Sequence, residues 1–400
     1  MTGGAVRRGR LAGAAALLLT AGLARPLAAA PCAGIPNAVI VTGSTAAKPL
    51  LAELGRVLVG QDPPVTVIYQ GQGSCGGVDA VLNGTPVLGA GATAFSYWDR
   101  GGVERKCDAP DAGLVADIGL SDVFAATCFP LPVGLPANVA DFLGPVNAMT
   151  FVVPRNSAEK SISAEAAYYV YGFGNGSGVD PWTDETAIFR RDALSGTQRM
   201  IGAAIGVDSL RWRGTATTSS TDMITQLNNA ATGARAIGIL STDVAQENRS
   251  TLKILAYQHF GQTCGYFPDR DATSNEKRNV RDGHYAIWGP LHLLTRLDGR
   301  GAPVSTLAAD LIGYLTGTKP PPTGVDMIQL TAQQHVIPPC AMRVKRTREI
   351  GPLASVAPAG SCGCYYEKLA NGATTCAPCS TAADCPAAAP ACNFGYCETQ

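Results

Sequence analysis

The sequence has few charged residues and no excess of either sign. Only 16% of its 400 residues are Asp, Glu, Lys or Arg, and 31 basic side chains stand against 31 acidic ones. A chain without a basic surplus is not expected to bind nucleic acid, because that binding draws on Lys and Arg to neutralise phosphates. Hydrophobic residues make up 46% of the chain, which predicts a folded protein of two or three domains.

Long apolar runs are also scarce. After residue 30, no stretch reaches the roughly 18 apolar residues that a transmembrane helix needs. The one earlier run, Leu11 to Ala24, follows Arg7, Arg8 and Arg10 and precedes small residues that suit signal peptidase. We therefore expect residues 1–30 to be an export signal and the mature protein to be soluble, in the periplasm or otherwise exported.

Histidine is nearly absent. None of the four histidines lies in a recognisable triad or metal motif. Ser74 sits among glycines, but Gln72 stands where a nucleophile elbow would need glycine. A hydrolase is therefore disfavoured, and we expect no catalytic residue, metal site or cofactor.

Cysteine, by contrast, is plentiful and unevenly distributed. Of 13 cysteines, six are spread over the main body and seven crowd into residues 362–400. In an exported chain this predicts disulfides, and the odd total leaves one thiol unpaired or paired between chains. A Cys-Ala-Pro-Cys run in the tail suggests zinc, but the tail has no histidine. We favour a disulfide-rich module over 362–400.

The body between these ends alternates short β-rich runs with helical patterns, which predicts an α/β fold. The expected strands are 38–41, 65–69, 149–153, 187–191 and 236–240. One expected helix starts near Ser44 or Thr45 and carries an apolar stripe of Leu50, Leu51, Leu54, Val57 and Leu58. Residues 84–113 break the pattern around Cys107 and are interpreted as a surface insertion, pinned by a disulfide and not catalytic. The basic run of Arg343, Lys345, Arg346 and Arg348, like Lys48, is interpreted as a solvated face.

Three segments share one form, a strand, then a tight loop rich in Gly, Ser and Thr, then a helix. They surround Thr45, Ser74 and Ser195. The first backbone N–H groups of a helix lack intrahelical partners and carry partial positive charge, so three such ends can form an anion cradle. Each loop alone is also explained by helix capping. Arg191, just before the third loop, adds a planar bidentate donor for an oxyanion.

These motifs resemble the periplasmic phosphate-binding proteins of high-affinity phosphate ABC transporters, within the type II solute-binding family. The resemblance covers roughly residues 35–339. It rests on Gly43-Ser44-Thr45 followed by Pro49, YQGQGSCGGV from Tyr69 to Val78, DIGLSD from Asp117 to Asp122, Arg191 with Ser195 to Thr197, and AIGIL from Ala236 to Leu240. The YQGQGSCGGV run is the most specific of these.

The resemblance implies a two-lobed type II periplasmic binding protein fold, with crossing hinge strands near 143–147 and 284–288. Lobe 1 would comprise residues 31–145 and 285–347, and lobe 2 would comprise 146–284. A linker over 348–361, poor in large apolar residues, would lead into the Cys-rich module. Cys75 is expected to pair with Cys107 or Cys128.

The same resemblance implies a set of phosphate ligands. They are Thr45, Ala46 through its backbone N–H, Ser74, Asp122, Arg191, Ser195, Gly196 and Thr197. Asp122 would accept the proton that phosphate keeps at neutral pH. Sulfate has no such proton, so it would place charge against charge.

Two choices stay open in this alignment. The GAGATAF segment at 89–95 competes with DIGLSD for the same place but lacks the acid. Arg190 keeps the family's spacing to Asp192, whereas Arg191 lies closer to Ser195. Alternate residues of a strand face opposite sides, so only one arginine points into the cleft, and we favour Arg191.

The favoured function is therefore capture of inorganic phosphate for delivery to the membrane permease of an ABC transporter, without a catalytic step. The alternative is an envelope or surface interaction protein that retains the binding fold. It would attach through its Cys-rich tail to a partner in the cell envelope.

Overall fold

The computed structural model describes residues 1–4 and 30–399. The predicted export signal therefore lies almost entirely outside the described residues. Within the described part, no helix combines the length and the apolar character needed to cross a bilayer.

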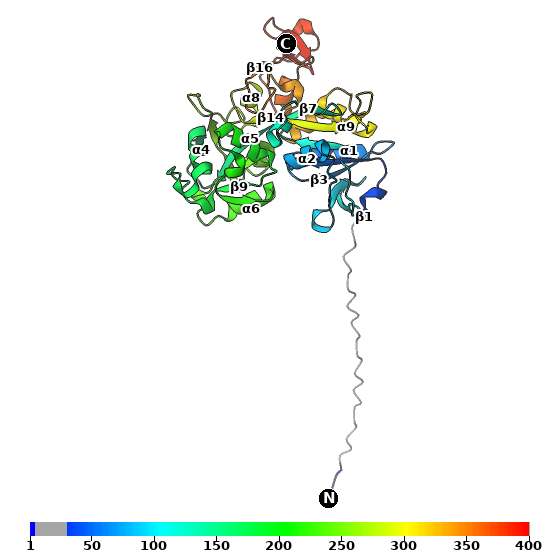
Figure 1. The fold of residues 1–400 in the computed structure, drawn as a ribbon, viewed down its shortest axis with the longest axis vertical. Helices are drawn as coiled ribbons and strands as arrows, with labels where there is room; N and C mark the ends of the chain where they lie inside the picture. The colour runs from blue at the N-terminus through cyan, green and yellow to red at the C-terminus, as the bar shows by residue number, and fades with distance from the viewer. Residues whose placement is uncertain (5–29, 400) are drawn as a thin grey trace.

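The chain forms two α/β lobes joined by crossing strands, as predicted (Figure 1). In lobe 1, β2 (Ala38–Gly43) pairs in parallel with β3 (Thr66–Gly71) and β6 (Ile118–Ser121). The remaining elements of this lobe are β1 (Ala30–Pro31), β4 (Phe95–Trp98), β5 (Glu104–Asp108), α1 (Lys48–Val59), α2 (Ser74–Leu82), α3 (Ala125–Cys128) and α9 (Thr306–Thr316).

Two long antiparallel strands connect the lobes, β7 (Val139–Pro154) and β14 (Trp288–Arg296). β14 pairs with β6 of lobe 1, while the far end of β7 pairs with two lobe 2 strands. The elements of lobe 2 are β8 (Ser161–Ser163), β9 (Phe189–Arg191), β10 (Thr215–Thr217), β11 (Gly238–Ser241), β12 (Leu252–Ile254), β13 (Ala256–Gln258), α4 (Ala164–Phe173), α5 (Gly196–Ile205), α6 (Ser220–Asn229), α7 (Thr242–Glu247) and α8 (Arg278–Arg281).

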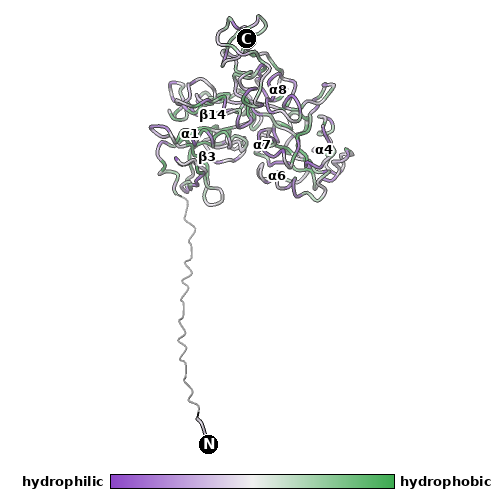
Figure 2. The backbone as a smooth tube through the Cα atoms, turned by 180° about the vertical axis from the view of Figure 1, so that it is seen from behind, coloured by the Kyte–Doolittle hydropathy of each residue, from purple (hydrophilic) through white to green (hydrophobic). Residues whose placement is uncertain are grey.

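Each lobe has its own apolar core. Leu51, Leu54 and Leu293 belong to the core of lobe 1, and Phe151 and Tyr257 to that of lobe 2. Figure 2 shows the lobes from behind, with α6 and α7 on the side of lobe 2 nearer lobe 1 and α4 on its outer side. Separate cores allow the lobes to move as rigid bodies about the connecting strands.

Each predicted strand overlaps an observed one, but the first helix begins at Lys48 rather than near Ser44 or Thr45. Pro49 lies in its first turn, where the missing N–H costs nothing. Ser44 instead belongs to the loop before the helix, and its hydroxyl donates a hydrogen bond to the carboxyl of Asp122. The hydroxyl residues of this loop are thus free of helical geometry and can face the cleft between the lobes.

Six disulfides form, and Cys264 is left as an exposed free thiol, as the odd count predicted. Cys75 pairs with Cys128, one of its two expected partners. Cys107 pins the insertion to Cys32. In the tail, the bridges are Cys340–Cys362, Cys364–Cys376, Cys379–Cys392 and Cys385–Cys397, so these sulfurs are not free thiolates for zinc.

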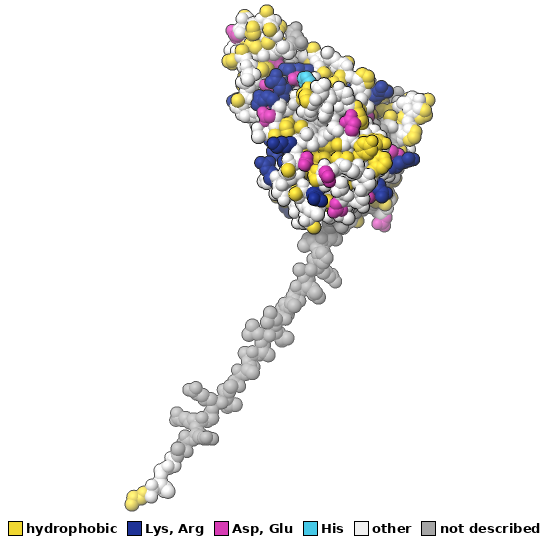
Figure 3. Space-filling model, turned by 90° about the vertical axis from the view of Figure 1, so that its left-hand side faces the viewer, with side chains coloured by type: hydrophobic (Ala, Val, Ile, Leu, Met, Phe, Trp, Pro, Cys, Tyr) yellow, Lys and Arg dark blue, Asp and Glu magenta, His cyan; other side chains and the backbone are white. Residues whose placement is uncertain are grey.

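The C-terminal region is anchored to the body before it protrudes. It contains α10 (Met327–Gln333), β15 (Val344–Lys345), β16 (Ala354–Ser355), α11 (Gly363–Asn371), β17 (Ala391–Asn393) and β18 (Tyr396–Glu398). Tyr366 of α11 is fully buried in the lobe 2 core, and Glu367 bonds Arg281 at 3.0 Å. Residues beyond α11 form the tip at the top of Figure 1, which is mainly uncharged in Figure 3.

One residue of the basic run does not lie on a solvated face. Arg346 is buried, with its guanidinium 4.0 Å from the centre of the Trp288 ring at the start of β14. The aromatic face supplies a cation–π contact that favours burial of the charge. The expectation of a solvated basic face was therefore wrong for Arg346.

The segment after Arg346 also carries a half-buried acid, Glu349. Glu349 accepts hydrogen bonds through Oε2 from the Phe124 N–H at 3.2 Å and the Thr127 hydroxyl at 3.4 Å. Its Oε1 is sealed from solvent and has no partner among the described residues. Burial raises the pKa of Glu349 to about 7. The segment thus places a titrating carboxyl just behind the Asp122 loop.

We expect Glu349 to make stability depend on pH. The raised pKa means that the folded state binds the proton of Glu349 more tightly than the unfolded state does. The stabilisation of the folded state by this proton is therefore complete below about pH 4.5 and is lost as pH rises through 7. The shift corresponds to about 3 kcal/mol. Denaturant unfolding at pH 5 and pH 8 should show that Glu349→Gln gains stability relative to the parent at pH 8. Glu165→Gln, an exposed control, should not, and equal behaviour of both variants would contradict this.

Candidate functional site

The two lobes touch at the loops that the sequence singled out. The N–H of Cys75, in the first turn of α2, donates to the carbonyl of Leu194, just before α5, at 3.1 Å. Gly73, with φ +80°, allows this approach, because an added Cβ would lie 2.6 Å from the same carbonyl oxygen. The structure is therefore closed here, with the starts of α2 and α5 facing each other.

Asp122 lies at the centre of this contact and is buried. Its Oδ2 accepts a hydrogen bond from the Ser44 hydroxyl at 2.6 Å and from the Ser74 hydroxyl at 3.0 Å. Its own backbone N–H donates to Ser74 Oγ at 3.0 Å. Burial raises the pKa of Asp122, while the bonds from Ser44 and Ser74 lower it and the nearby charge of Asp243 raises it. Asp122 is therefore a buried carboxyl held by hydroxyls from two segments of lobe 1.

The start of α5 faces this acid from lobe 2. Gly196 packs against Ser74, and any side chain at Gly196 would collide with Ser74 Oγ. Ser195 caps the helix by accepting the N–H of Gln198, and the hydroxyl of Thr197 donates to the sulfur of Met149 at 3.4 Å. The backbone N–H groups at this first turn lack intrahelical partners, so the helix presents donors and partial positive charge to the cleft.

Arg191 is buried at the same edge, with 3% exposure. Its contacts are long: Nη1 to Ser220 Oγ is 3.4 Å, and Nη2 to the Thr218 carbonyl is 3.5 Å. Its Nε has no partner among the described residues. Burial lowers the pKa of this guanidinium, and the charges of Asp192 and Asp122 oppose the change. The side chain therefore retains donors that an anion can use.

Arg190 has a different environment. It is half-buried, and its Nε donates to the carbonyl of Gly214 at 3.0 Å. Its Nη1 donates to the carbonyl of Arg191 at 3.3 Å. Arg190 thus supports the backbone, while the neighbouring Arg191 carries the guanidinium whose environment includes the charge of Asp122.

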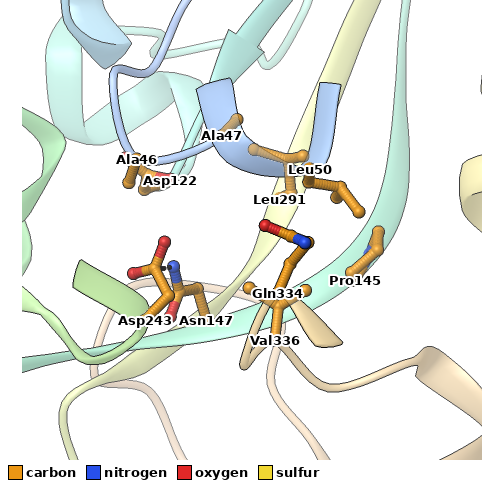
Figure 4. Close-up of a pocket in the computed structure, with 10 residues that line it drawn as sticks. All are labelled: Ala46, Ala47, Leu50, Asp122, Pro145, Asn147, Asp243, Leu291, Gln334 and Val336. Atoms are coloured by element: carbon orange, nitrogen blue, oxygen red, sulfur yellow. Dashed lines mark hydrogen bonds between the residues drawn. The ribbon is translucent and has the colours of Figure 1, made fainter. Parts of the chain in front are cut away.

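The two predicted residues of the first loop face different spaces. Ala46 lines a small cavity of about 20 Å³ together with Asp122 and Asp243 (Figure 4). Thr45 is half-buried and lines a neighbouring cavity of about 570 Å³. The structure thus brings Ser74, Asp122 and Gly196 into direct contact, whereas Thr45 stands to one side.

Three further residues belong to this centre. Ser44, which the sequence indicated only as a possible helix start and as part of the Gly43-Ser44-Thr45 motif, makes the shorter of the two side-chain bonds to Asp122. Asp243 of α7 is buried, and its Oδ1 accepts from the side-chain amide of Asn147 on β7 at 3.0 Å. Burial raises the pKa of Asp243. In Figure 4 its carboxyl points toward Ala46 and Asp122. The only sequence signal for Asp243 is its position just after the AIGIL run.

The GAGATAF segment does not supply the site. Gly89 packs against Gln70 and Phe95 at the β4 side of lobe 1. The acid that meets Ser74 is Asp122 at the end of the DIGLSD run. Of the two competing segments, only the second reaches the loop contact between the lobes.

Neither a protein-family model nor a curated protein matches this sequence. Solved structures are nevertheless similar in fold. A protein from Clostridium perfringens, described as a phosphate ABC transporter substrate-binding protein with bound phosphate, aligns at a TM-score of 0.50 and 14% identity, over 76% of this chain and 99% of its own. An ABC-type phosphate transport receptor from Vibrio cholerae gives a TM-score of 0.48 and 17% identity, over 75% of this chain and 100% of its own. At such identities, the likeness to the first shows that this chain has the two-lobed fold of a substrate-binding protein.

Proposed function

We propose that this protein is an exported solute-binding protein that captures inorganic phosphate between its lobes for an ABC permease. The observation that carries the proposal is the position of Asp122. It is buried, bonded by the hydroxyls of Ser44 and Ser74 of lobe 1, and faced by Gly196 at the start of α5. The charge of Asp122 also acts on the pKa of the buried Arg191 guanidinium of lobe 2. Such a centre combines anion donors with the carboxyl of Asp122, and the carboxyl of Asp243 lines the same small cavity.

The chemistry of this centre suits an oxyanion that carries a proton. Hydroxyls, helix N–H groups and one guanidinium stabilise negative charge. The carboxyl of Asp122 then selects for a ligand oxygen that brings or shares a hydrogen, as monohydrogen phosphate does. Sulfate would leave Asp122 and a sulfate oxygen facing each other without a hydrogen between them.

The proposed ligands are Thr45, Ala46, Ser74, Asp122, Arg191, Ser195, Gly196 and Thr197, joined by Ser44. The cavity beside Asp122, about 20 Å³, is close to the space of one water molecule, so a tetrahedral ion would enter with the lobes slightly apart. The proposed lobes are residues 31–145 with 285–347 and residues 146–284, followed by a linker over 348–361 and the module 362–400. The six disulfides favour an oxidising compartment such as the periplasm.

Titration calorimetry of residues 31–400 with phosphate and with sulfate tests the proposal. Saturable heat with phosphate and none with sulfate supports it. The absence of heat with either ion would contradict it. That second outcome would favour the alternative in which the protruding, mainly uncharged tip attaches the protein to an envelope partner.

Asp122→Asn is expected to weaken selectivity more than fold stability. The amide keeps the shape of the carboxyl but presents donors in place of an anion, so it no longer repels sulfate. We expect phosphate affinity to fall roughly tenfold and sulfate to bind measurably, since one good charged contact is worth about 1.5–3 kcal/mol. Asp79→Asn on the outer part of α2 is the matched control. If Asp122→Asn still fails to bind sulfate, Asp122 does not have the proposed role in selectivity.

A further inference from the structure

The larger cavity beside Thr45 adjoins the proposed phosphate site and measures about 570 Å³. Its walls include Thr45, Lys48, Ser96 and Lys106 of lobe 1 and Thr218 of lobe 2. This volume lies within the range of about 300–1,000 Å³ typical of small-molecule sites. It is far larger than the space beside Asp122.

The cavity is bordered by the same segments that form the proposed site. Thr45 lies between Ser44, which bonds Asp122, and Ala46, which lines the smaller cavity. On the lobe 2 side, the carbonyl of Thr218 accepts a hydrogen bond from Arg191 Nη2 at 3.5 Å. A ligand group held at Asp122 and Arg191 would therefore have its next group within reach of this cavity.

The wall of the cavity carries a surplus of positive charge. Lys48 Nζ and Lys106 Nζ lie 2.9 and 3.1 Å from the same oxygen, Glu104 Oε1. The hydroxyl of Ser96 also donates to that oxygen, at 2.7 Å. Burial raises the pKa of Glu104, but the bonds from Ser96, Lys48 and Lys106 lower it to about 2. At neutral pH one ionised carboxylate therefore faces two lysines, which leaves one positive charge uncompensated.

Part of this wall comes from the predicted insertion at 84–113, while Lys48 belongs to α1. Ser96 lies on β4, while Glu104 and Lys106 lie on β5, the next strand of an antiparallel pair at the edge of the lobe 1 sheet. The disulfide between Cys107 and Cys32 fixes β5 to the start of the lobe. The insertion thus contributes Ser96 and Lys106 to the wall of the cavity, and α1 contributes Lys48.

We propose that this cavity receives a second phosphoryl group, so that the preferred ligand is a diphosphate with one phosphoryl group at Asp122 and Arg191 and the other at Lys48 and Lys106. The inference rests on the proposed oxyanion site and specifies its ligand class. Lysine suits this task, because an ammonium binds phosphoryl oxygens as a mobile point charge. The volume also leaves space for an organic group beyond the second phosphoryl group.

The test compares inorganic phosphate, inorganic diphosphate and uridine diphosphate by titration calorimetry of residues 31–400. We expect diphosphate to bind at least tenfold more tightly than phosphate. Tighter binding of uridine diphosphate than of inorganic diphosphate identifies an organic diphosphate as the ligand. The reverse order identifies the free ion.

Two variants change the net positive charge of the cavity wall in opposite directions. Lys48→Ala combined with Lys106→Ala should remove the diphosphate preference and leave phosphate affinity unchanged within about threefold. Glu104→Gln should strengthen diphosphate binding by roughly tenfold, because both lysines become free. Lys345→Ala, at an exposed lysine on β15, is the control.

The outcomes separate this inference from the proposed function. Phosphate binding with no preference for either diphosphate overturns the inference and leaves the proposed function standing. Diphosphate binding without phosphate binding supports the inference and contradicts inorganic phosphate as the ligand. No binding of any of the three ions contradicts both.

Discussion

Arg191→Ala is expected to lower phosphate affinity by roughly 100-fold or more. The guanidinium is 3% exposed, has long contacts to Ser220 and Thr218, and keeps its Nε unpaired among the described residues. Removing a buried charge from an ionic contact costs about 2–5 kcal/mol. Calorimetry with phosphate measures the effect, with thermal unfolding as a check that the variant folds.

Arg190→Ala is the matched control for this experiment. The neighbouring side chain carries the same charge but bonds the carbonyls of Gly214 and Arg191. We expect it to change stability slightly and phosphate affinity by less than about threefold. A larger loss of affinity in Arg190→Ala than in Arg191→Ala would show that the other arginine binds the ion.

Gly196→Ala is expected to prevent closure and to lower phosphate affinity by roughly 30-fold or more. The new methyl group fits the first turn of α5 locally, but it collides with Ser74 Oγ and lies near Asp122 Oδ2. Opening of the lobes relieves this clash, so each lobe should still fold. A misplacement of about 1 Å in a positioned site costs as much as 100-fold in function. In the presence of phosphate, small-angle scattering should show a larger radius of gyration for Gly196→Ala than for the parent protein.

Gly176→Ala provides the control, because nothing lies within 4 Å of a Cβ added there. Adding Ser74→Gly to Gly196→Ala should restore the closed dimensions without restoring affinity, since the Ser74 hydroxyl is then absent. If Gly196→Ala closes and binds phosphate as the parent does, the contact between α2 and α5 is not the ligand site.

The individual strands and the first helix were largely predictable because their signals are local, whereas the two-lobed arrangement was implied by the resemblance to a known family. Apolar runs such as 38–41 and 65–69 reappear as β2 and β3, and the stripe beginning at Leu50 lies on α1. The start of α1 was placed too early because Ser44 suits either a helix cap or a loop. That ambiguity is resolved by a partner 78 residues away, the carboxyl of Asp122.

The central contact of the candidate site was also predictable in part. Ser74 lies in one of the three loops that the sequence identified as helix starts, whereas Asp122 and Gly196 were implied by the resemblance to phosphate-binding proteins. The structure brings the three together. Asp243 was missed because an acid in the first turn of a helix is ordinary in sequence. Asp243 reaches the small cavity only because α7 lies beside β7, as its hydrogen bond to Asn147 of β7 shows.

The burial of Arg346 and the partial burial of Glu349 could not be predicted either. Both lie in or beside a segment poor in large apolar residues, which indicates a linker. The disulfide from Cys340 to Cys362 holds this segment against the body, so that Arg346 packs on Trp288. Tertiary constraint, rather than local composition, determines their environment.

A crystal structure of residues 31–400 grown with phosphate tests the central claim most directly. We expect tetrahedral density between the lobes, within hydrogen-bonding distance of Ser74 Oγ, the Asp122 carboxyl, the Gly196 N–H and the Arg191 guanidinium. Density for the ion only on an outer surface, with Ser74 and Asp122 still bonded to each other as described, would contradict the account.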